Sequence, residues 1–326
     1  MTAASRTYWL TEPCRIRREN DSVRIERTGS DAVHVPITDI SDLIAFDHVD
    51  INTSAISLLG RHGVTVHILD HYGNYAGAVA PADGMSSALV VREQVALSAD
   101  PERRLAVARA IVAAAASNVR WALDSDLLDA PLARLGDQLV DCRDTNGLMG
   151  LEGNFRRTAW GVLDTMLPPW LRLDGRSRRS PANAGNAFVS YANAITYARV
   201  LTALRCTPLH PALGFLHADT DRRRNTLALD IAEAFKPLFA ERILKRAAAQ
   251  KTLHGGDFES SAGYASLSRA GRKNVARLLR AEFAATIYHR ALRRKVSYDE
   301  LLHLEALKLV RLCLEDTPYK PFRPWW

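Results

Sequence analysis

The sequence predicts an α+β protein, in which a small N-terminal β-sheet domain is followed by a larger all-α C-terminal domain. Two observations support this prediction. Over about the first 80 residues, apolar and polar side chains alternate and turn residues recur, which is typical of strands. After the linker Ala80-Pro-Ala-Asp-Gly-Met-Ser86, apolar residues recur with the period of a helix almost to the end. We place the two domains at residues 1–85 and 86–326, a length that can bury a full core.

The N-terminal part contains a hairpin signature. Val23–Arg27 alternates apolar and polar residues, a Gly-Ser-Asp turn follows at 29–31, and Val33–Ile37 continues the pattern. Asn52–Gly60 predicts a short helix with a polar N-cap and a glycine end. Further strands are expected at Asp39–Ile51, Val64–Leu69 and Tyr75–Val79. Together these segments predict one small sheet with one helix packed on it.

The C-terminal part carries helix signals at both of its ends. Asp100-Pro101-Glu102 combines an N-cap, a proline at the first position and an acid in the first turn. Ser297-Tyr-Asp-Glu300 is a capping box before an apolar-periodic segment. Pro237 is expected to kink or break the helix that contains it. Helices are predicted over roughly 147–167, 184–205, 226–249 and 266–292, with turn-rich loops at 168–181 and 207–225.

The charge is unevenly distributed along the chain. The net charge is +7, but residues 1–85 hold 7 basic and 11 acidic residues, so the rest of the chain has a net charge of +11. A polyanion, most commonly a nucleic acid, is therefore a plausible partner, and a solvated basic surface is the alternative. No apolar run is long enough to span a membrane, and the N-terminus lacks a signal-peptide core. We expect a cytoplasmic protein without a membrane partner.

One imidazole and several carboxylates form a candidate site for a hard divalent cation. The residues are Glu152 between two glycines, His217 in a loop, and Asp230 and Glu233 on one face of a predicted helix. Taken singly, each is more commonly structural: a solvated glutamate, a packed histidine, or a half-exposed acidic edge. Together, their oxygen atoms suit Mg²⁺ or Mn²⁺, and one imidazole favours Mn²⁺. Such a cation among arginine clusters indicates chemistry on a phosphate.

Other potential ligands are set aside. The cysteines at 14, 142, 206 and 313 form no CxxC motif, and they are expected to be free thiols. His62, His67 and His71 lie in the β part, where no acidic site surrounds them in the pattern. We interpret these histidines as surface or strand residues.

Four stretches in order along the chain resemble the CRISPR-associated integrase of the adaptation machinery, the Cas-one family. The β part fits as well, through Ile51–Leu59 and Val64–Gly73. Any one stretch would be a weak signal, but the ordered set is specific and covers nearly the whole chain. The stretches are Gly147-Leu-Met-Gly-Leu-Glu-Gly153, Asn186–Tyr197, Leu213-Gly-Phe-Leu-His217 and Leu227-Ala-Leu-Asp-Ile-Ala-Glu-Ala-Phe-Lys-Pro237.

The resemblance implies that Glu152, His217 and Glu233 are the catalytic metal ligands. Asp230 matches a further acidic position that contacts or supports the metal in some members of the family. The cofactor would be Mg²⁺ or Mn²⁺. Two departures concern residues that we expect not to touch a ligand: Ala218-Asp219 stands where many members have a glycine, and Lys236 stands where arginine is common.

The resemblance also implies a homodimer made through the β-domains that works with the small partner Cas-two. The complex would hold a DNA duplex, whose 3′-hydroxyls attack the repeat of the CRISPR array by transesterification. The arginines expected to contact DNA phosphates are Arg156, Arg176, Arg178, Arg179, Arg222, Arg223 and Arg224. Two alternatives remain: a generic metal-dependent nuclease that uses water as the attacker, and a catalytically silent DNA-binding assembly subunit.

Overall fold

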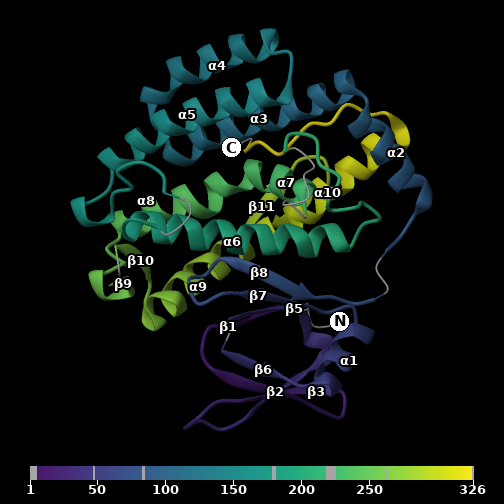
Figure 1. The fold of residues 1–326 in the computed structure, drawn as a ribbon, viewed down its shortest axis with the longest axis vertical. Coiled ribbons are helices and arrows are strands. Elements are labelled where there is room, and N and C mark those ends of the chain that lie inside the picture. The colour runs from purple at the N-terminus through teal and green to yellow at the C-terminus, as the bar shows by residue number, and fades with distance from the viewer. Residues whose placement is uncertain are drawn as a thin grey trace.

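The computed structural model of the chain describes residues 6–46, 48–82, 85–177, 181–217, 225–261 and 263–324. Figure 1 shows the N-terminal strands gathered at one end of the molecule and the helices at the other. The predicted α+β fold is confirmed, with a β-rich part that ends at β8 (Tyr75–Val79) and a mainly helical part that begins at α2 (Ala88–Ala99).

The N-terminal part contains two four-stranded sheets instead of the single sheet that was predicted. The first has the order β1 (Arg6–Leu10), β5 (Ile40–Phe46), β7 (Thr65–Leu69) and β8, with only the β7–β8 pair antiparallel. The second has the order β4 (Val33–Pro36), β3 (Ser22–Glu26), β2 (Cys14–Glu19) and β6 (Val49–Ile51). The predicted hairpin is β3–β4. The predicted short helix is α1 (Thr53–Arg61), where the Asn52 side chain accepts a hydrogen bond from the Ala55 amide at 2.9 Å.

Strand β5 shows why two sheets form. Leu43 and Ala45 point into the core of the β-rich part, whereas Ile44 and Phe46 belong to the core shared with the helices. Successive side chains on a strand point to opposite faces, so the first sheet is buried on both faces. One face is covered within the β-rich part, and the other lies against α6 (Ala184–Arg205), as Figure 1 shows.

The helical part is built around two long helices, α3 (Pro101–Leu123) and α6. The predicted start of α3 is confirmed, because the Asp100 carboxylate accepts hydrogen bonds from the amides of Glu102 and Arg103 at 2.9 and 3.0 Å. The other helices are α4 (Asp129–Asp141), α5 (Thr145–Thr165), α7 (Thr226–Lys236), α8 (Arg242–Ala249), α9 (Arg269–Ala284) and α10 (Tyr298–Glu315). Short 3₁₀ turns lie at Ile37–Asp39, Asp126–Leu128, Pro169–Leu171 and Gly255–Asp257.

The sequence had predicted an all-α C-terminal part, but this part also contains strands. The helix expected over 266–292 ends at Ala284, and its continuation is the hairpin β11 (Thr286–His289) and β12 (Arg294–Ser297). A second hairpin joins β9 (Phe258–Ser261) to β10 (Tyr264–Leu267). Exposure alternates residue by residue along β11, the pattern of a strand with one covered face, and this short alternation was read as part of the preceding helix.

Pro237 does not end the helical run, but regular α-helix stops just before it, at Lys236. It begins a π-helical turn, Pro237–Glu241, that joins α7 directly to α8. Proline lacks an amide hydrogen and its ring crowds the preceding turn, so a wider turn accommodates it without ending the helix.

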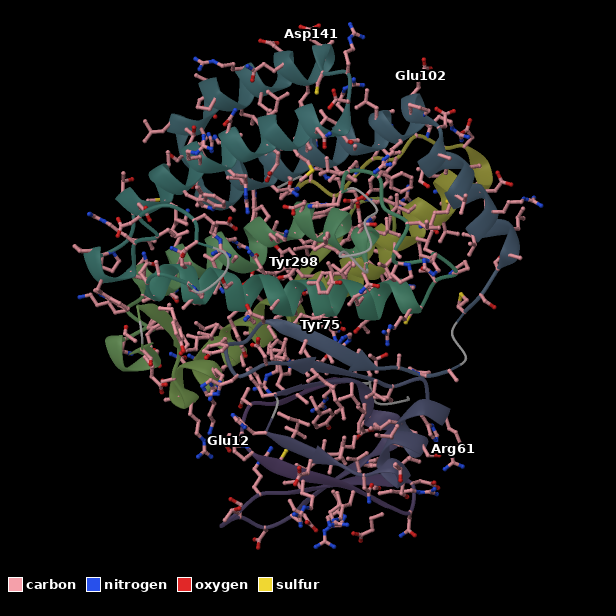
Figure 2. All side chains as sticks on the ribbon, in the orientation of Figure 1. Glu12, Arg61, Tyr75, Glu102, Asp141 and Tyr298 are labelled. Atoms are coloured by element: carbon pink, nitrogen blue, oxygen red, sulfur yellow. The ribbon has the colours of Figure 1, made fainter. Side chains whose placement is uncertain are left out.

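Buried polar side chains join the two parts of the molecule. His67 on β7 is fully buried, and its ring nitrogens lie 3.1 Å from the Tyr75 hydroxyl and 2.8 Å from that of Thr202 on α6. His67 is therefore a strand residue at the domain boundary and not a surface residue. Figure 2 shows Tyr75 at this boundary, between the strands and α6. No helix in the described parts of the chain is long and apolar enough to cross a membrane.

Candidate metal centre

His217 is held in one orientation by Asp230. The carboxylate of Asp230, fully buried on α7, lies 2.7 Å from Nδ1 of His217 and accepts the His217 amide at 3.0 Å. It also accepts the amides of Phe215 and Leu216, at 2.5 and 2.9 Å. A carboxylate that accepts from Nδ1 leaves the lone pair on Nε2, which is the tautomer that binds a metal. Oδ1 of Asp230 therefore orients the imidazole and Oδ2 anchors the loop before it, which fits the supporting role that the resemblance gave as one option.

The loop that carries His217 is anchored from two helices. The buried amide of Gln94 on α2 donates to the carbonyls of His210 and Leu213, at 3.0 and 2.8 Å. Arg104 on α3 donates to the Phe215 carbonyl at 2.8 Å. A Cβ atom on Gly214 would lie 2.8 Å from the Asp230 carboxylate, so only glycine permits this close approach to α7.

The sequence analysis missed these anchors. Gln94 shares the buried face of α2 with Val90 and Leu97, and this spacing was a usable signal, because a polar residue on an apolar face needs a partner.

Glu233 faces the free side of the His217 ring. It lies one turn after Asp230 on α7, with its Oε1 4.0 Å from Nε2 of His217, and the two side chains are 12% and 14% exposed. Lys236 forms an ion pair with the same oxygen of Glu233. Burial acts to raise the pKa of Glu233, but Lys236, His217 and Arg156 outweigh it and lower the pKa to about 2. The expectation that Lys236 touches no ligand is therefore wrong.

Glu152 enters the site from α5. Its Oε1 lies 3.6 Å from Nε of Arg156, one turn along the same helix, and its side chain is 19% exposed. Arg156 also pairs with Glu241 at 2.8 Å, and only 7% of its side chain is exposed. Burial opposes the charge of Arg156, but Glu241, Glu152 and Glu233 together raise its pKa. Arg156 is thus a buried ion-pairing residue, and the prediction that it contacts DNA phosphates is corrected.

Glycines flank Glu152 on α5. A Cβ atom on Gly150 or Gly153 would meet no atom within 4 Å. The two glycines therefore leave the backbone beside Glu152 uncovered in the described part of the chain.

The donor set fits a divalent cation. Two ligand atoms, each about 2.1 Å from one ion, are separated by roughly 3.0 Å at right angles and 4.2 Å when opposite. The 4.0 Å between Nε2 of His217 and Oε1 of Glu233 falls within this range. Across the described residues, no three His, Cys, Asp or Glu side chains are already gathered as a cage. The candidate ligands do not converge on one point because Glu233 pairs with Lys236 and Glu152 lies next to Arg156.

The remaining predicted arginines are not brought to this site by the described contacts. Arg176 donates to the Asn186 side chain and to the Ser190 hydroxyl, both at 3.0 Å, and so ties its loop to α6. Arg178, Arg179, Arg222, Arg223 and Arg224 lie outside the described residues. Whether these arginines bind DNA stays a prediction.

A basic cleft that the sequence analysis did not single out lies between the β-rich part and α9. Its volume is about 550 Å³, and Arg27, Lys273, Arg277 and Arg280 line it together with Trp9. Lys273, Arg277 and Arg280 recur at helical spacing on the exposed side of α9, which is the signal that could have identified them. An ion pair between Arg269 and Glu12, at 3.4 Å, joins the two walls.

Comparisons with known proteins agree with this architecture. The family model of CRISPR associated protein Cas1 matches residues 7–281. A CRISPR-associated endonuclease Cas1 from Thermodesulfovibrio yellowstonii is 33% identical over 325 residues, covering 98% of this chain and all of the relative. The solved structure of a CAS1 protein from Thermotoga maritima superposes with a TM-score of 0.86 at 25% identity, over 95% of this chain and 97% of that one.

Two further solved structures share the fold at lower identity. A casposase bound to integration product has a TM-score of 0.85 at 18% identity, over 96% of this chain and 91% of that chain. A Cas6-RT-Cas1--Cas2 complex has a TM-score of 0.85 at 19% identity, over 99% of this chain and 36% of the other.

The fold and the family match lead to one class, the CRISPR-associated proteins. Within that class, this chain belongs to the CRISPR associated protein Cas1 family, the Cas-one family of the sequence resemblance.

Proposed function

We propose that this protein is a metal-dependent DNA integrase that joins 3′-hydroxyl ends of a DNA duplex to a CRISPR repeat by transesterification. Mg²⁺ or Mn²⁺ would be held by Glu152, His217 and Glu233. The observation that carries the proposal is the orientation of His217, whose Nδ1 is engaged by Asp230 while Nε2 is directed toward Glu233. An imidazole fixed in this way beside ionised carboxylates is a ligand set for a divalent cation.

A bound divalent cation would withdraw charge from a phosphate and orient the attacking hydroxyl. The chain's own residues do the rest. Asp230 holds the His217 ring so that Nε2 faces Glu233, and the low pKa of Glu233 keeps that carboxylate ionised at neutral pH. In the reaction, the 3′ oxygen forms a new bond to phosphorus as the bond to the leaving 3′ oxygen breaks, so one phosphodiester replaces another without an external energy source.

The basic cleft supports DNA binding. Its cations come from both parts of the molecule, Arg27 from the β-rich part and Lys273, Arg277 and Arg280 from α9. Cations that line one groove attract a phosphate backbone without reading its sequence. A casposase with this fold has been solved with its integration product, and a related chain has been solved in a complex with Cas2. We also propose that the protein works with Cas2, and that it does so as a homodimer in the cytoplasm.

A metal-dependent nuclease would use the same ligands with water as the attacker. A strand-transfer assay separates the two functions: purified protein, Cas2, a labelled short duplex and a plasmid that carries the repeat are incubated with Mn²⁺. Label transferred to the plasmid supports the integrase, whereas shortened duplex with no joined product supports the nuclease. If wild-type protein gives neither product and Glu152→Gln behaves identically, the proposed site is wrong.

DNA binding by the cleft is tested separately from catalysis. Lys273→Ala with Arg280→Ala should weaken binding of any duplex and reduce the slope of log affinity against log salt by about 0.9 for each lost phosphate contact. Arg61→Ala with Arg134→Ala, which alters exposed cations elsewhere, is the matched control. An unchanged slope in the Lys273/Arg280 variant would remove the cleft from the DNA-binding surface.

A further inference from the structure

The π turn determines where Glu241 points. Glu233 and Glu241 are eight residues apart on the continuous run from α7 through Pro237–Glu241. At 100° per residue, a regular α-helix would turn Glu241 roughly 80° away from the Glu233 direction. A π turn spreads the rotation over more residues, so it brings Glu241 back toward the face that carries Glu233. The turn that accommodates Pro237 therefore directs a second carboxylate to the metal centre.

Glu241 reaches the site through Arg156. The Glu241 side chain is 1% exposed, and its Oε1 lies 2.8 Å from the Arg156 guanidinium. Arg156 in turn lies 3.6 Å from Glu152, and its guanidinium is 5.4 Å from the centre of the Trp160 ring. Nε1 of Trp160 donates to the same Glu241 oxygen at 3.4 Å. Glu241 and Trp160 therefore both contact the Arg156 side chain that lies next to Glu152.

Glu241 keeps one oxygen without a partner. Among the described residues, the four carboxylates of Glu152, Asp230, Glu233 and Glu241 outnumber the cations that contact them, Arg156 and Lys236. The guanidinium of Arg104 lies on the His217 carbonyl at 3.4 Å. Oε2 of Glu241 is buried and has no hydrogen-bond partner in the described part of the chain. A buried carboxylate with an unpartnered oxygen is costly unless nearby positive charge compensates it, and a divalent cation bound here would supply such charge.

We propose that Glu241 is a positioning residue of the metal centre, which holds Arg156 so that Glu152 can bind a divalent cation. The inference rests on the proposed function, because it assumes that a metal binds at Glu152. When the cation arrives, it and Arg156 compete for the Glu152 carboxylate. The 2.8 Å contact to Glu241 is shorter than the 3.6 Å contact to Glu152, so Arg156 stays with Glu241 and Glu152 turns to the metal. Without the Glu241 charge, Arg156 would have only Glu152 and Glu233 as anionic partners.

The test measures metal affinity and not only activity. Free Mn²⁺ is titrated by electron paramagnetic resonance against wild type, Glu241→Gln and Glu282→Gln, and each variant is also heated to record its Tm. Glu282 is the matched control because it is similarly buried and pairs with Arg242 and Arg246, both at 2.7 Å, away from the proposed ligands. We expect Glu241→Gln to weaken Mn²⁺ binding about tenfold or more, as other supporting residues of metal ligands do. Glu282→Gln should lower the Tm but leave the Mn²⁺ Kd unchanged.

A double-mutant cycle shows whether Glu241 acts through Arg156. In an Arg156→Gln background, the competing cation is absent, so Glu241→Gln should change the Mn²⁺ Kd less than twofold. Equal losses of Mn²⁺ affinity in both glutamate variants, or an unchanged Kd in folded Glu241→Gln, overturn the inference. If wild type and Glu241→Gln bind Mn²⁺ with the same Kd, that result contradicts only this inference. Wild type that binds no Mn²⁺ contradicts the proposed metal centre and this inference together.

Discussion

Two buried clusters of charged side chains in this molecule have opposite properties. At the domain boundary, Arg199 pairs with Asp42 and Asp299, and the oxygens of Asp42 also accept hydrogen bonds from Thr7 at 2.7 Å and Thr202 at 3.3 Å. Both ring nitrogens of His67 there have hydroxyl partners. At the metal centre, carboxylates outnumber cations, and Nε2 of His217 faces a carboxylate at 4.0 Å, beyond hydrogen-bonding distance.

The difference separates a structural cluster from a functional one. In the boundary cluster the charges balance, because the two carboxylates of Asp42 and Asp299 are matched by the cations Arg199 and Arg205. Arg205 also donates a hydrogen bond to Thr65 at 3.1 Å. Saturated buried networks rigidify the structure around them. The metal centre keeps unused ligand atoms and negative charge, which makes it ready for a cation. Substitutions in the first cluster should therefore affect stability, and substitutions in the second should affect chemistry.

The largest expected effect is at the metal centre. Glu152→Gln removes one proposed ligand and should reduce strand transfer at least about 1000-fold, roughly 4 kcal/mol of barrier. Its unfolding free energy should stay within about 1 kcal/mol of wild type, because the buried Arg156 retains its ion pair with Glu241. The rate comes from gel assays of joined product and the stability from urea unfolding, with the exposed Glu259→Gln as control. Full strand transfer by folded Glu152→Gln would remove the distinction between the two clusters.

Breaking the boundary cluster should have the opposite outcome. Arg199→Met leaves Asp42 fully buried without its cation, which should cost about 3–5 kcal/mol of unfolding free energy. The Mn²⁺ Kd of the protein that remains folded should equal that of wild type. Arg311→Met is the control, since Arg311 is 63% exposed and its pair with Glu315 contributes about 0–1 kcal/mol. If Arg199→Met lowers the unfolding free energy no more than Arg311→Met does, the boundary charges do not contribute to folding stability.

The boundary cluster also predicts how stability depends on pH. Burial, reinforced by Arg205 and Arg199 and opposed by Asp42, lowers the pKa of His67 from 6.5 to about 4. As the pH falls through this interval, the unfolded chain binds a proton that the folded chain does not. Stability should therefore decline from pH 6.5 to 4, by up to roughly 3 kcal/mol from this group. Urea unfolding of wild type and His67→Gln across the interval measures this contribution, and identical slopes for both would contradict it.

The smallest effect sharpens the role of Asp230. Asp230→Asn keeps the size of the side chain but replaces one acceptor oxygen with an amide, so it disturbs the His217 tautomer without removing a ligand. We expect a roughly 10- to 100-fold loss of Mn²⁺ affinity, smaller in its effect on strand transfer than Glu152→Gln. Electron paramagnetic resonance gives the Kd. A loss of strand transfer as large as that of Glu152→Gln would instead indicate that Asp230 binds the metal directly.

Local sequence signals predicted much of the fold. The N-caps Asn52, Asp100 and Ser297 each hold the amides expected of them, and α6 begins and ends where its periodicity predicted. Segments whose character depends on neighbours were predicted less well. The hairpin β11–β12 was taken for helix, and the capping box is only half formed because Glu300 pairs with Arg294 instead of turning back to Ser297.

The chemistry of the candidate site followed from residue types and from the family resemblance, but the hydrogen bonds and ion pairs between its side chains did not. Glu152, His217 and Glu233 were proposed as a ligand set, and in the structure Glu233 lies beside His217 while Glu152 lies beside Arg156. The helical spacing of Asp230 and Glu233 indicated a shared face, yet Asp230 serves the His217 loop and Glu233 faces the ring. Arg156 was predicted to contact DNA phosphates, and its pairing with Glu241 could not be read from spacing.

By itself, the sequence determined most of the helices and the N-terminal strands and indicated candidate metal-binding side chains, because caps, periodicity and ligand chemistry are properties of residues close together in the chain. Only the tertiary structure decided which charges are satisfied. Gln94 and His210 are 116 residues apart, and Arg199 and Asp42 are 157 apart. Whether a buried charge is paired depends on packing between such distant segments. Among the described residues, that packing leaves the metal centre with more carboxylates than cations in contact with them, and it balances the charges at the domain boundary.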